Sequence, residues 1–157
     1  ISWSEYSRSQ ELLFKEHSEQ LGADVRSILE TASGYLARDY LAAQQARSVI
    51  IREYQSLWDD VDILLTPTTP IPAPKVGEPV LFEVAKLTRA ASLTGEPAVS
   101  IPCGFTTSGL PIGMHLQTKR YGEPLLYRVA YVYESGTDWY KTVPPNSFDL
   151  WKKFNDK

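Results

Sequence analysis

The chain has 157 residues, of which 43% are hydrophobic, so it is long and apolar enough to bury a core and is not a disordered segment. A formal net charge of −3 excludes the basic surface with which proteins bind nucleic acids or anionic membranes. No apolar run reaches the roughly 20 residues that span a bilayer, and a single cysteine, Cys103, excludes an internal disulfide. We therefore expect a cytoplasmic protein without direct contacts to nucleic acid or membrane.

Residues 1–60 are predicted to be mainly helical. Good helix formers fill residues 9–16, and Gly22 is placed to end a first helix. A second helix is expected over residues 24–35, starting at a capping aspartate. A third and longer helix follows, because one stripe recurs at steps of three and four residues: Tyr40, Ala43, Arg47, Ile50, Tyr54 and Leu57.

Residues 61–136 are predicted to form a core of strands and helices. The short apolar run 61–66, stopped by Pro67, suits a strand buried on both faces of a parallel or mixed sheet. The five prolines within residues 67–79 require an extended loop there. A helix is then expected over residues 81–93, with Gly95 at its end.

The second half of this core is predicted to be a strand pair followed by a helix. Strands at 98–101 and 112–117 flank turn residues at 107–109. A helix from residue 123 to 135 ends at Gly136, with one apolar face formed by Leu126, Val129, Ala130 and Tyr133. Residues 137–157 are aromatic but broken by prolines, so we expect a tail docked on the surface. Residues 1–157 together are interpreted as a single partial domain.

The threonines of the proline-rich segment are candidate binding residues. Thr66 and Thr68 alternate with prolines just past a strand end, which is where open α/β sheets bind their ligands. Hydroxyl groups on a backbone stiffened by proline can present fixed hydrogen bonds at little entropic cost. The structural alternative is that the prolines merely end the strand and the threonines cap the turn.

Cys103 offers a second, weaker candidate site. If the two strands pair about Ser108, His115 could lie close enough to activate a thiolate. No acid that would orient the imidazole is evident, and a lone cysteine at a strand end is more often a small buried residue. The sequence contains no recognisable metal cluster, phosphate loop or nucleophile-elbow motif.

Three motifs in fixed order carry a family resemblance. They are Asp-x-Leu-Leu-x-Pro-Thr-x-Pro at 62–70, Leu-Thr-Gly-x-Pro-Ala with Pro-Cys-Gly at 93–104, and Gly-Leu-Pro-x-Gly at 109–113. Together they resemble the C-terminal part of the amidase signature family. The resemblance implies an α/β fold, a mixed β-sheet between helical layers that is incomplete in this fragment. It also implies hydrolysis of a small-molecule carboxamide to acid and ammonia without metal or organic cofactor.

The resemblance places the chemistry outside this chain. Family enzymes use a Ser–cis-Ser–Lys triad, and all three residues lie upstream of the matched region, so no residue here is expected to be catalytic. The missing N-terminal part of the same enzyme is the expected partner, in keeping with a chain that opens at Ile1 without an initiator methionine. We expect the chain alone to be inactive and to expose apolar surface, which could also support a homo-oligomer.

Substrate binding is the contribution that the resemblance leaves to this part, and Thr66, Thr68, Thr94 and Arg26 are the residues predicted to take part in it. Glutaminase subunits of tRNA-dependent amidotransferases place an acidic residue ten positions before the glycine matched by Gly95, whereas this sequence has Ala85. Arg26 could face a substrate carboxylate. The missing countercharge favours a general amidase. The alternatives that remain are a non-catalytic binding or scaffold module and an amidotransferase A subunit.

Overall fold

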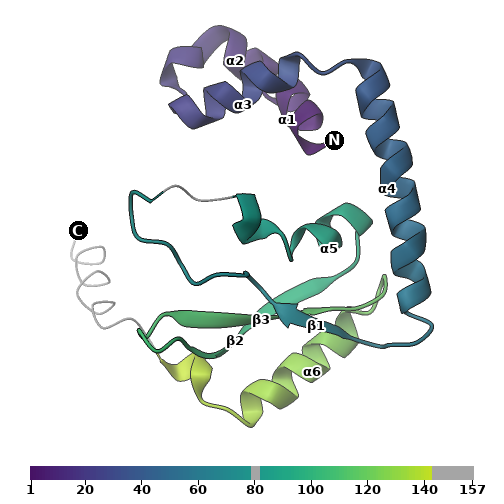
Figure 1. Ribbon diagram of the computed structural model, residues 1–157, viewed down its shortest axis with the longest axis vertical. Coiled ribbons are helices and arrows are strands. Elements are labelled where there is room, and N and C mark those ends of the chain that lie inside the picture. The colour runs from purple at the N-terminus through teal and green to yellow at the C-terminus, as the bar shows by residue number, and fades with distance from the viewer. Residues whose placement is uncertain (79–81, 143–157) are drawn as a thin grey trace. The chain divides into compact units, whose positions relative to one another are not determined.

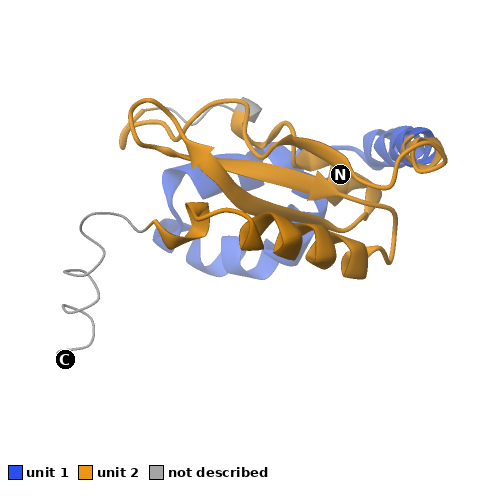
Figure 2. Cartoon of the chain, turned by 90° about the horizontal axis from the view of Figure 1, so that it is seen from below, with its two compact units in different colours: residues 1–53 blue, residues 54–157 orange. Residues whose placement is uncertain are grey.

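A computed structural model describes residues 1–78 and 82–142. The chain divides into two compact units, residues 1–53 and residues 54–157 (Figure 2). The first unit is helical, and the second combines a small sheet with helices. No helix within the described ranges is long and apolar enough to cross a membrane.

The first unit begins with two short helices, α1 (Ser2–Ser9) and α2 (Glu11–His17), followed by a 3-10 turn, η1 (Ser18–Gln20). The single first helix expected from the sequence is therefore wrong, because the chain breaks at Gln10. Gln10 leaves the helical conformation, with φ −100° and ψ 6°, although its N–H still donates to the Tyr6 carbonyl at 2.9 Å. The second expected helix is confirmed as α3 (Ala23–Ser33), which buries Leu29 and Ala32 and is followed by Gly34.

The long helix predicted from its periodic stripe is confirmed as α4 (Ala37–Leu57). Its start is supported by Asp39, whose carboxylate accepts a hydrogen bond from the Leu36 N–H at 3.2 Å. None of its 21 residues is buried in this structure. The periodic stripe of α4 has the pattern of a face that packs against a core, but within the described residues no other element buries it fully.

The second unit is built on a three-stranded sheet with strand order β1-β3-β2 (Figure 1). Its strands are β1 (Leu64–Pro67), β2 (Ala98–Phe105) and β3 (Pro111–Gln117), and both pairings are antiparallel. The predicted strand pair is confirmed, with the turn closed by a hydrogen bond from the Thr106 N–H to the Leu110 carbonyl at 2.8 Å.

The prediction for the first strand needs correction. It begins at Leu64, three residues later than expected, and the Asp62 carbonyl instead accepts a hydrogen bond from the Thr118 hydroxyl at 2.7 Å. Burial on both faces is also wrong for this chain, since Leu65 is 59% exposed. The reason is topological, because among residues 1–78 and 82–142 β1 pairs with β3 alone and lies at the edge of the sheet.

Helices lie on both faces of this sheet, α5 (Arg89–Thr94) on one and α6 (Glu123–Ser135) on the other (Figure 1). The core forms between the sheet and α6, where Ile101 and Leu116 pack with Leu126 and Ala130. The predicted bounds and apolar face of α6 are confirmed, with Val129 and Tyr133 packed at the edge of that core.

The helix expected over residues 81–93 is wrong over most of its length. Leu81 lies outside the described residues, and the chain then forms a 3-10 turn, η2 (Phe82–Ala85), before α5 begins at Arg89. Between η2 and α5, the Thr88 hydroxyl donates to the Ala85 carbonyl at 3.2 Å. Gly95 ends α5 in the left-handed conformation (φ 78°), as its place in the sequence predicts.

The start of the C-terminal tail packs on the sheet. Another 3-10 turn, η3 (Trp139–Lys141), brings Trp139 to Phe105 of β2, and the two rings meet edge to face with centroids 6.1 Å apart. The rest of the expected docked tail, residues 143–157, lies outside the described residues.

Candidate functional site

Three polar side chains lie side by side across the sheet, on the face opposite α6. The strand register places His115 of β3 directly opposite Thr66 of β1 and, on its other side, opposite Ser100 of β2. The Thr66 hydroxyl oxygen is 3.4 Å from His115 Nδ1, so the two side chains form a weak hydrogen bond. Leu116, the neighbour of His115, points the other way into the core with α6.

Burial favours the neutral form of the His115 side chain. Its side chain is only 5% exposed, and burial lowers the pKa of the imidazole below its ordinary value near 6.5. A neutral ring has one nitrogen that donates and one that accepts. The ring can therefore either donate to the Thr66 hydroxyl or accept from it.

A second hydroxyl pair lies one step further along the same face. The Thr68 N–H donates to the Gly113 carbonyl at 2.8 Å, which extends the ladder beyond β1. The Thr68 and Ser100 hydroxyl oxygens are 2.5 Å apart, so the pair reaches over β3 from one edge of the sheet to the other.

This approach depends on Gly113 in the strand beneath. A Cβ atom at residue 113 would lie 2.6 Å from the Thr68 hydroxyl oxygen and 2.9 Å from that of Ser100. Both distances are too short for real contacts, so any larger residue would push the hydroxyl pair apart. The sequence suggested Gly113 only as part of a motif, and Ser100 was missed, although its alternation with Val99 and Ile101 in a short strand signals a polar face.

Thr94 lies in a different environment from Thr66 and Thr68. It is 1% exposed, and its hydroxyl oxygen is 2.9 Å from the Ala90 carbonyl and 3.0 Å from the Glu96 carboxylate. The side chain thus faces inward at the end of α5. Its role in substrate binding stays a prediction, as does that of Arg26, which is half-buried on α3 in the other unit.

Glu96 is a buried carboxylate that no sequence pattern singled out. It is 8% exposed and accepts hydrogen bonds from Trp58 Nε1 at 2.6 Å and Gln117 Nε2 at 2.7 Å, in addition to its contact with Thr94. An acid between a turn glycine and the proline that enters a strand is the signal that could have drawn attention to it. Its donors tie the segment after α4, the end of α5 and β3 to one point.

Cys103 does not pair with His115. The register shifts between Pro102 and Gly104, so Cys103 sits in a bulge, and its Sγ lies 3.5 Å from the Ile112 carbonyl oxygen. His115 instead faces Ser100 and bonds Thr66. The structure therefore offers no thiolate–imidazole dyad between these two residues.

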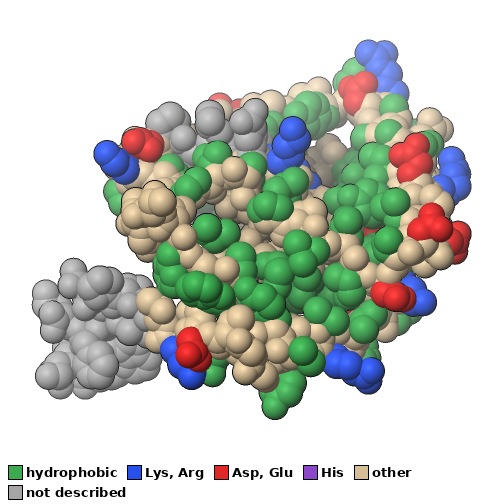
Figure 3. Space-filling model, turned by 60° about the horizontal axis from the view of Figure 1, so that its bottom comes forward, with side chains coloured by type: hydrophobic (Ala, Val, Ile, Leu, Met, Phe, Trp, Pro, Cys, Tyr) green, Lys and Arg blue, Asp and Glu red, His purple; other side chains and the backbone are tan. Residues whose placement is uncertain are grey.

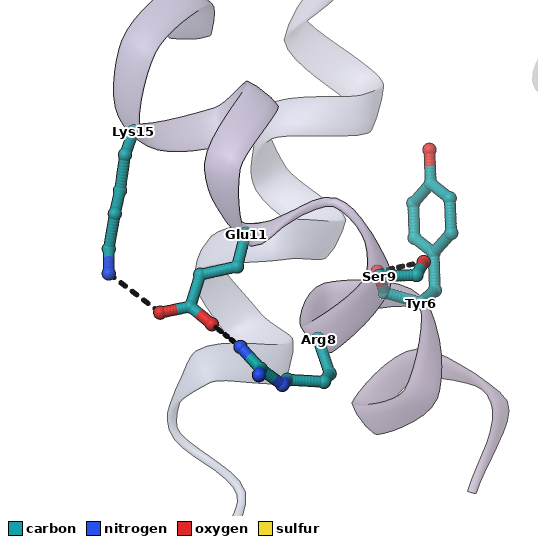
Figure 4. Close-up of polar contacts among 5 residues, drawn as sticks. All are labelled: Tyr6, Arg8, Ser9, Glu11 and Lys15. Carbon is teal, nitrogen blue, oxygen red and sulfur yellow. Dashed lines mark hydrogen bonds and ion pairs between the residues drawn. The ribbon is translucent and has the colours of Figure 1, made fainter.

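The first unit has a surface hollow of about 550 Å³ beside its N-terminal helices. Arg8, Glu11 and Lys15 are among the residues that line it, and Arg8 and Lys15 both pair with the Glu11 carboxylate (Figure 4). Hydrogen bonds from Lys15 and Arg8 lower the pKa of Glu11. These charged side chains are exposed and form ion pairs with one another. We therefore interpret this part of the surface as a solvated ion-pair cluster and not as a ligand site.

Comparisons with known proteins identify the family to which the chain is similar. The amidase family matches residues 3–127. The glutamyl-tRNA(Gln) amidotransferase A subunit of Gloeothece citriformis is 43% identical over 119 residues, covering 73% of this chain and 25% of that protein. Its counterpart from Thermodesulfovibrio yellowstonii is 36% identical over 144 residues, covering 85% of this chain and 30% of that protein.

Solved structures give the same result for the fold. An amidase crystal structure superposes with a TM-score of 0.81 at 25% identity, covering 87% of this chain and 33% of that one. A 6-aminohexanoate cyclic dimer hydrolase, at 22% identity, shares the fold with a TM-score of 0.76, covering 91% of this chain and 34% of that one. The chain thus spans about a quarter to a third of the length of the relatives that it matches.

Proposed function

This chain belongs to the amidase family, and we propose that it is the C-terminal part of a carboxamide hydrolase. The single observation that carries the proposal is the match of residues 3–127 to that family together with the short span, about a quarter to a third, of its relatives. In the complete enzyme, the nucleophilic serine of a Ser–cis-Ser–Lys triad in the upstream part would attack the amide carbonyl and expel ammonia, and water would then hydrolyse the acyl–serine ester and restore the serine. The products would be a carboxylic acid and ammonia.

The described residues support a binding role for this part. Thr66 and Thr68 present half-buried hydroxyls on one face of the sheet, and both are held by neighbours on that face. A fixed hydroxyl can hold a substrate group with little loss of entropy. We propose that these two threonines line the wall of the substrate pocket whose catalytic groups come from the missing part.

Exposed apolar side chains support the proposal that another part of the enzyme covers this one. Figure 3 shows hydrophobic side chains gathered over a broad area of one face. On the second unit, the exposed large hydrophobic residues include Leu65, Ile112, Tyr127, Tyr131 and Val132. A contiguous group of exposed apolar side chains often marks the surface where another part of a protein packs. The upstream part of the same enzyme is the occupant that we propose, and self-association is what we expect in its absence.

Two versions of the proposal differ in the amide that the enzyme hydrolyses: a general carboxamide or the side-chain amide of glutamine. The curated relatives of this chain are A subunits of a glutamyl-tRNA(Gln) amidotransferase, which favours a glutaminase role as the second candidate. Ala85 favours a general amidase instead, because it supplies no countercharge for the ammonium group of glutamine. An uncompensated ammonium in a dry pocket is unfavourable by a few kcal/mol. We therefore propose a linear carboxamide without an α-ammonium group as the substrate.

The test is an ammonia-release assay on the complete gene product with three substrates: a short aliphatic carboxamide, an aromatic carboxamide and L-glutamine. We expect hydrolysis of the first two and little release from glutamine, and no release by residues 1–157 alone. Preferential hydrolysis of glutamine would establish the glutaminase candidate. Absence of ammonia from every substrate would overturn the hydrolase proposal and favour a binding or scaffold module.

A further inference from the structure

The contact between Thr68 and Ser100 joins two segments that do not otherwise pair. Thr68 directly follows β1, Ser100 lies in the middle of β2, and β3 runs between those two strands. Their hydroxyl oxygens nevertheless lie 2.5 Å apart, over a separation of 32 residues in the sequence. The contact spans the whole width of the described sheet.

The strand beneath is shaped to permit this contact. A Cβ atom at residue 113 would collide with both hydroxyl oxygens, at 2.6 Å from Thr68 and 2.9 Å from Ser100. The bare Gly113 backbone also accepts the Thr68 N–H at 2.8 Å. Thr68 is thus held at two points, by the backbone of β3 and by the side chain of β2.

The rest of the proline-rich segment has few other means of attachment. Pro67 and Pro70 have no N–H to donate. Within the part of the chain that the structure describes, the bond of Thr69 is local, from its hydroxyl to the Ile71 carbonyl at 2.8 Å. Among the described residues, Ser100 is therefore the side chain that fixes this segment to the far edge of the sheet.

We propose that Ser100 is a positioning residue: acting through Thr68, it sets where residues 67–71 stand over the sheet and so determines the length of acyl group that the enzyme accepts. The second half of this statement rests on the proposed function, in which Thr66 and Thr68 line the pocket. Ser100 does not act on the reacting atoms. Its loss should therefore change KM and the size preference while leaving kcat nearly unchanged.

The experiment uses the complete protein and three variants. Ser100→Ala removes the hydroxyl, and Ser100→Thr retains it as the conservative rescue. Ser108→Ala is the matched control, because Ser108 is an exposed serine of the same unit whose hydroxyl contacts its neighbour Thr106, at 2.9 Å. Two readouts are taken: hydrogen–deuterium exchange of peptides covering residues 64–76, and kinetics on linear amides of increasing acyl length.

In Ser100→Ala we expect exchange of the Thr68 amide, which donates to the Gly113 carbonyl, to become about fivefold faster or more, because the segment loses one of its two attachments. We expect KM for the preferred amide to rise about tenfold, with longer acyl chains better tolerated and kcat within about twofold of wild type. Ser100→Thr and Ser108→Ala should behave as wild type in both readouts.

Each contrary result has a distinct meaning. Unchanged exchange in Ser100→Ala would overturn the positioning role, whether or not the protein hydrolyses amides. Faster exchange with an unchanged size preference would overturn the link to substrate length. A wild-type protein that hydrolyses no amide would overturn the proposed function, and exchange would still decide whether Ser100 positions the segment.

Discussion

The indole N–H of Trp58 donates a hydrogen bond to Glu96 Oε1 at 2.6 Å, across 38 residues of sequence. Trp58 follows the end of α4, and Glu96 stands between the turn that closes α5 and the proline that leads into β2. A second donor, Gln117 Nε2 at the end of β3, reaches the other oxygen of the same carboxylate at 2.7 Å. One side chain thus joins three segments of the second unit.

Glu96→Ala should destabilise the second unit by about 3 kcal/mol, because it leaves the buried Gln117 amide and the half-buried Trp58 indole N–H without this acceptor. Urea unfolding of the 157-residue chain, followed by tryptophan fluorescence, measures the loss. Glu96→Gln is the control, and it should lose less stability, since its amide oxygen can still accept one of the hydrogen bonds. Equal midpoints for wild type and Glu96→Ala would show that this carboxylate does not hold the unit together.

His115 should make the fold sensitive to mild acid. Because burial lowers the pKa of this imidazole in the folded state, the unfolded chain binds a proton more readily than the folded one. The stabilising contribution is fully present above the unfolded pKa, near 6.5, and is lost as the pH falls from there through the lower folded pKa. His115→Asn should remove this contribution to the dependence of the free energy of unfolding on pH. The free energy of unfolding, measured over mildly acidic to neutral pH, checks it, and parallel curves for the two proteins would contradict it.

Gly113→Ala should destabilise the chain by about 1–3 kcal/mol, the usual range for forcing extra atoms into a packed site. At an ordinary strand position the same change would be neutral or favourable. Thr68→Ala removes the hydroxyl oxygen that lies 2.6 Å from the added Cβ, so the double variant should recover part of the loss. A double-mutant cycle by thermal unfolding measures this coupling, and additive effects would be the contrary result.

Leu126→Ala should destabilise the chain by about 3 kcal/mol, since Leu126 is 3% exposed in the core between α6 and the sheet. Tyr127→Ala, one residue away on the same helix, is the matched control, because its side chain is 69% exposed. We expect the control to change stability by less than about 0.5 kcal/mol. Denaturant unfolding of both variants measures the two changes in stability. Comparable losses of stability would mean that α6 buries a different face.

The features predicted correctly from the sequence are those with local causes. The bounds of α6 follow from its periodic apolar face and from Gly136, all within a few turns of one helix. The β2–β3 pair follows from two alternating runs separated by turn residues. The predictions that failed for the helices concern where the chain leaves the helical conformation, at Gln10 and before Arg89, and the periodicity of apolar residues does not register such breaks.

The sequence by itself determined the family and most of the order of the elements, because motif order and period are properties of neighbouring residues, whereas the binding role of the threonines beside the prolines stays a prediction. Only the tertiary structure decided which distant side chains meet. Ser100 reaches Thr68, and Trp58 reaches Glu96, through a register and a packing that no local pattern records. A shift of one residue in that register would turn Ser100 and His115 to the opposite face, so these contacts exist only once the whole sheet has formed.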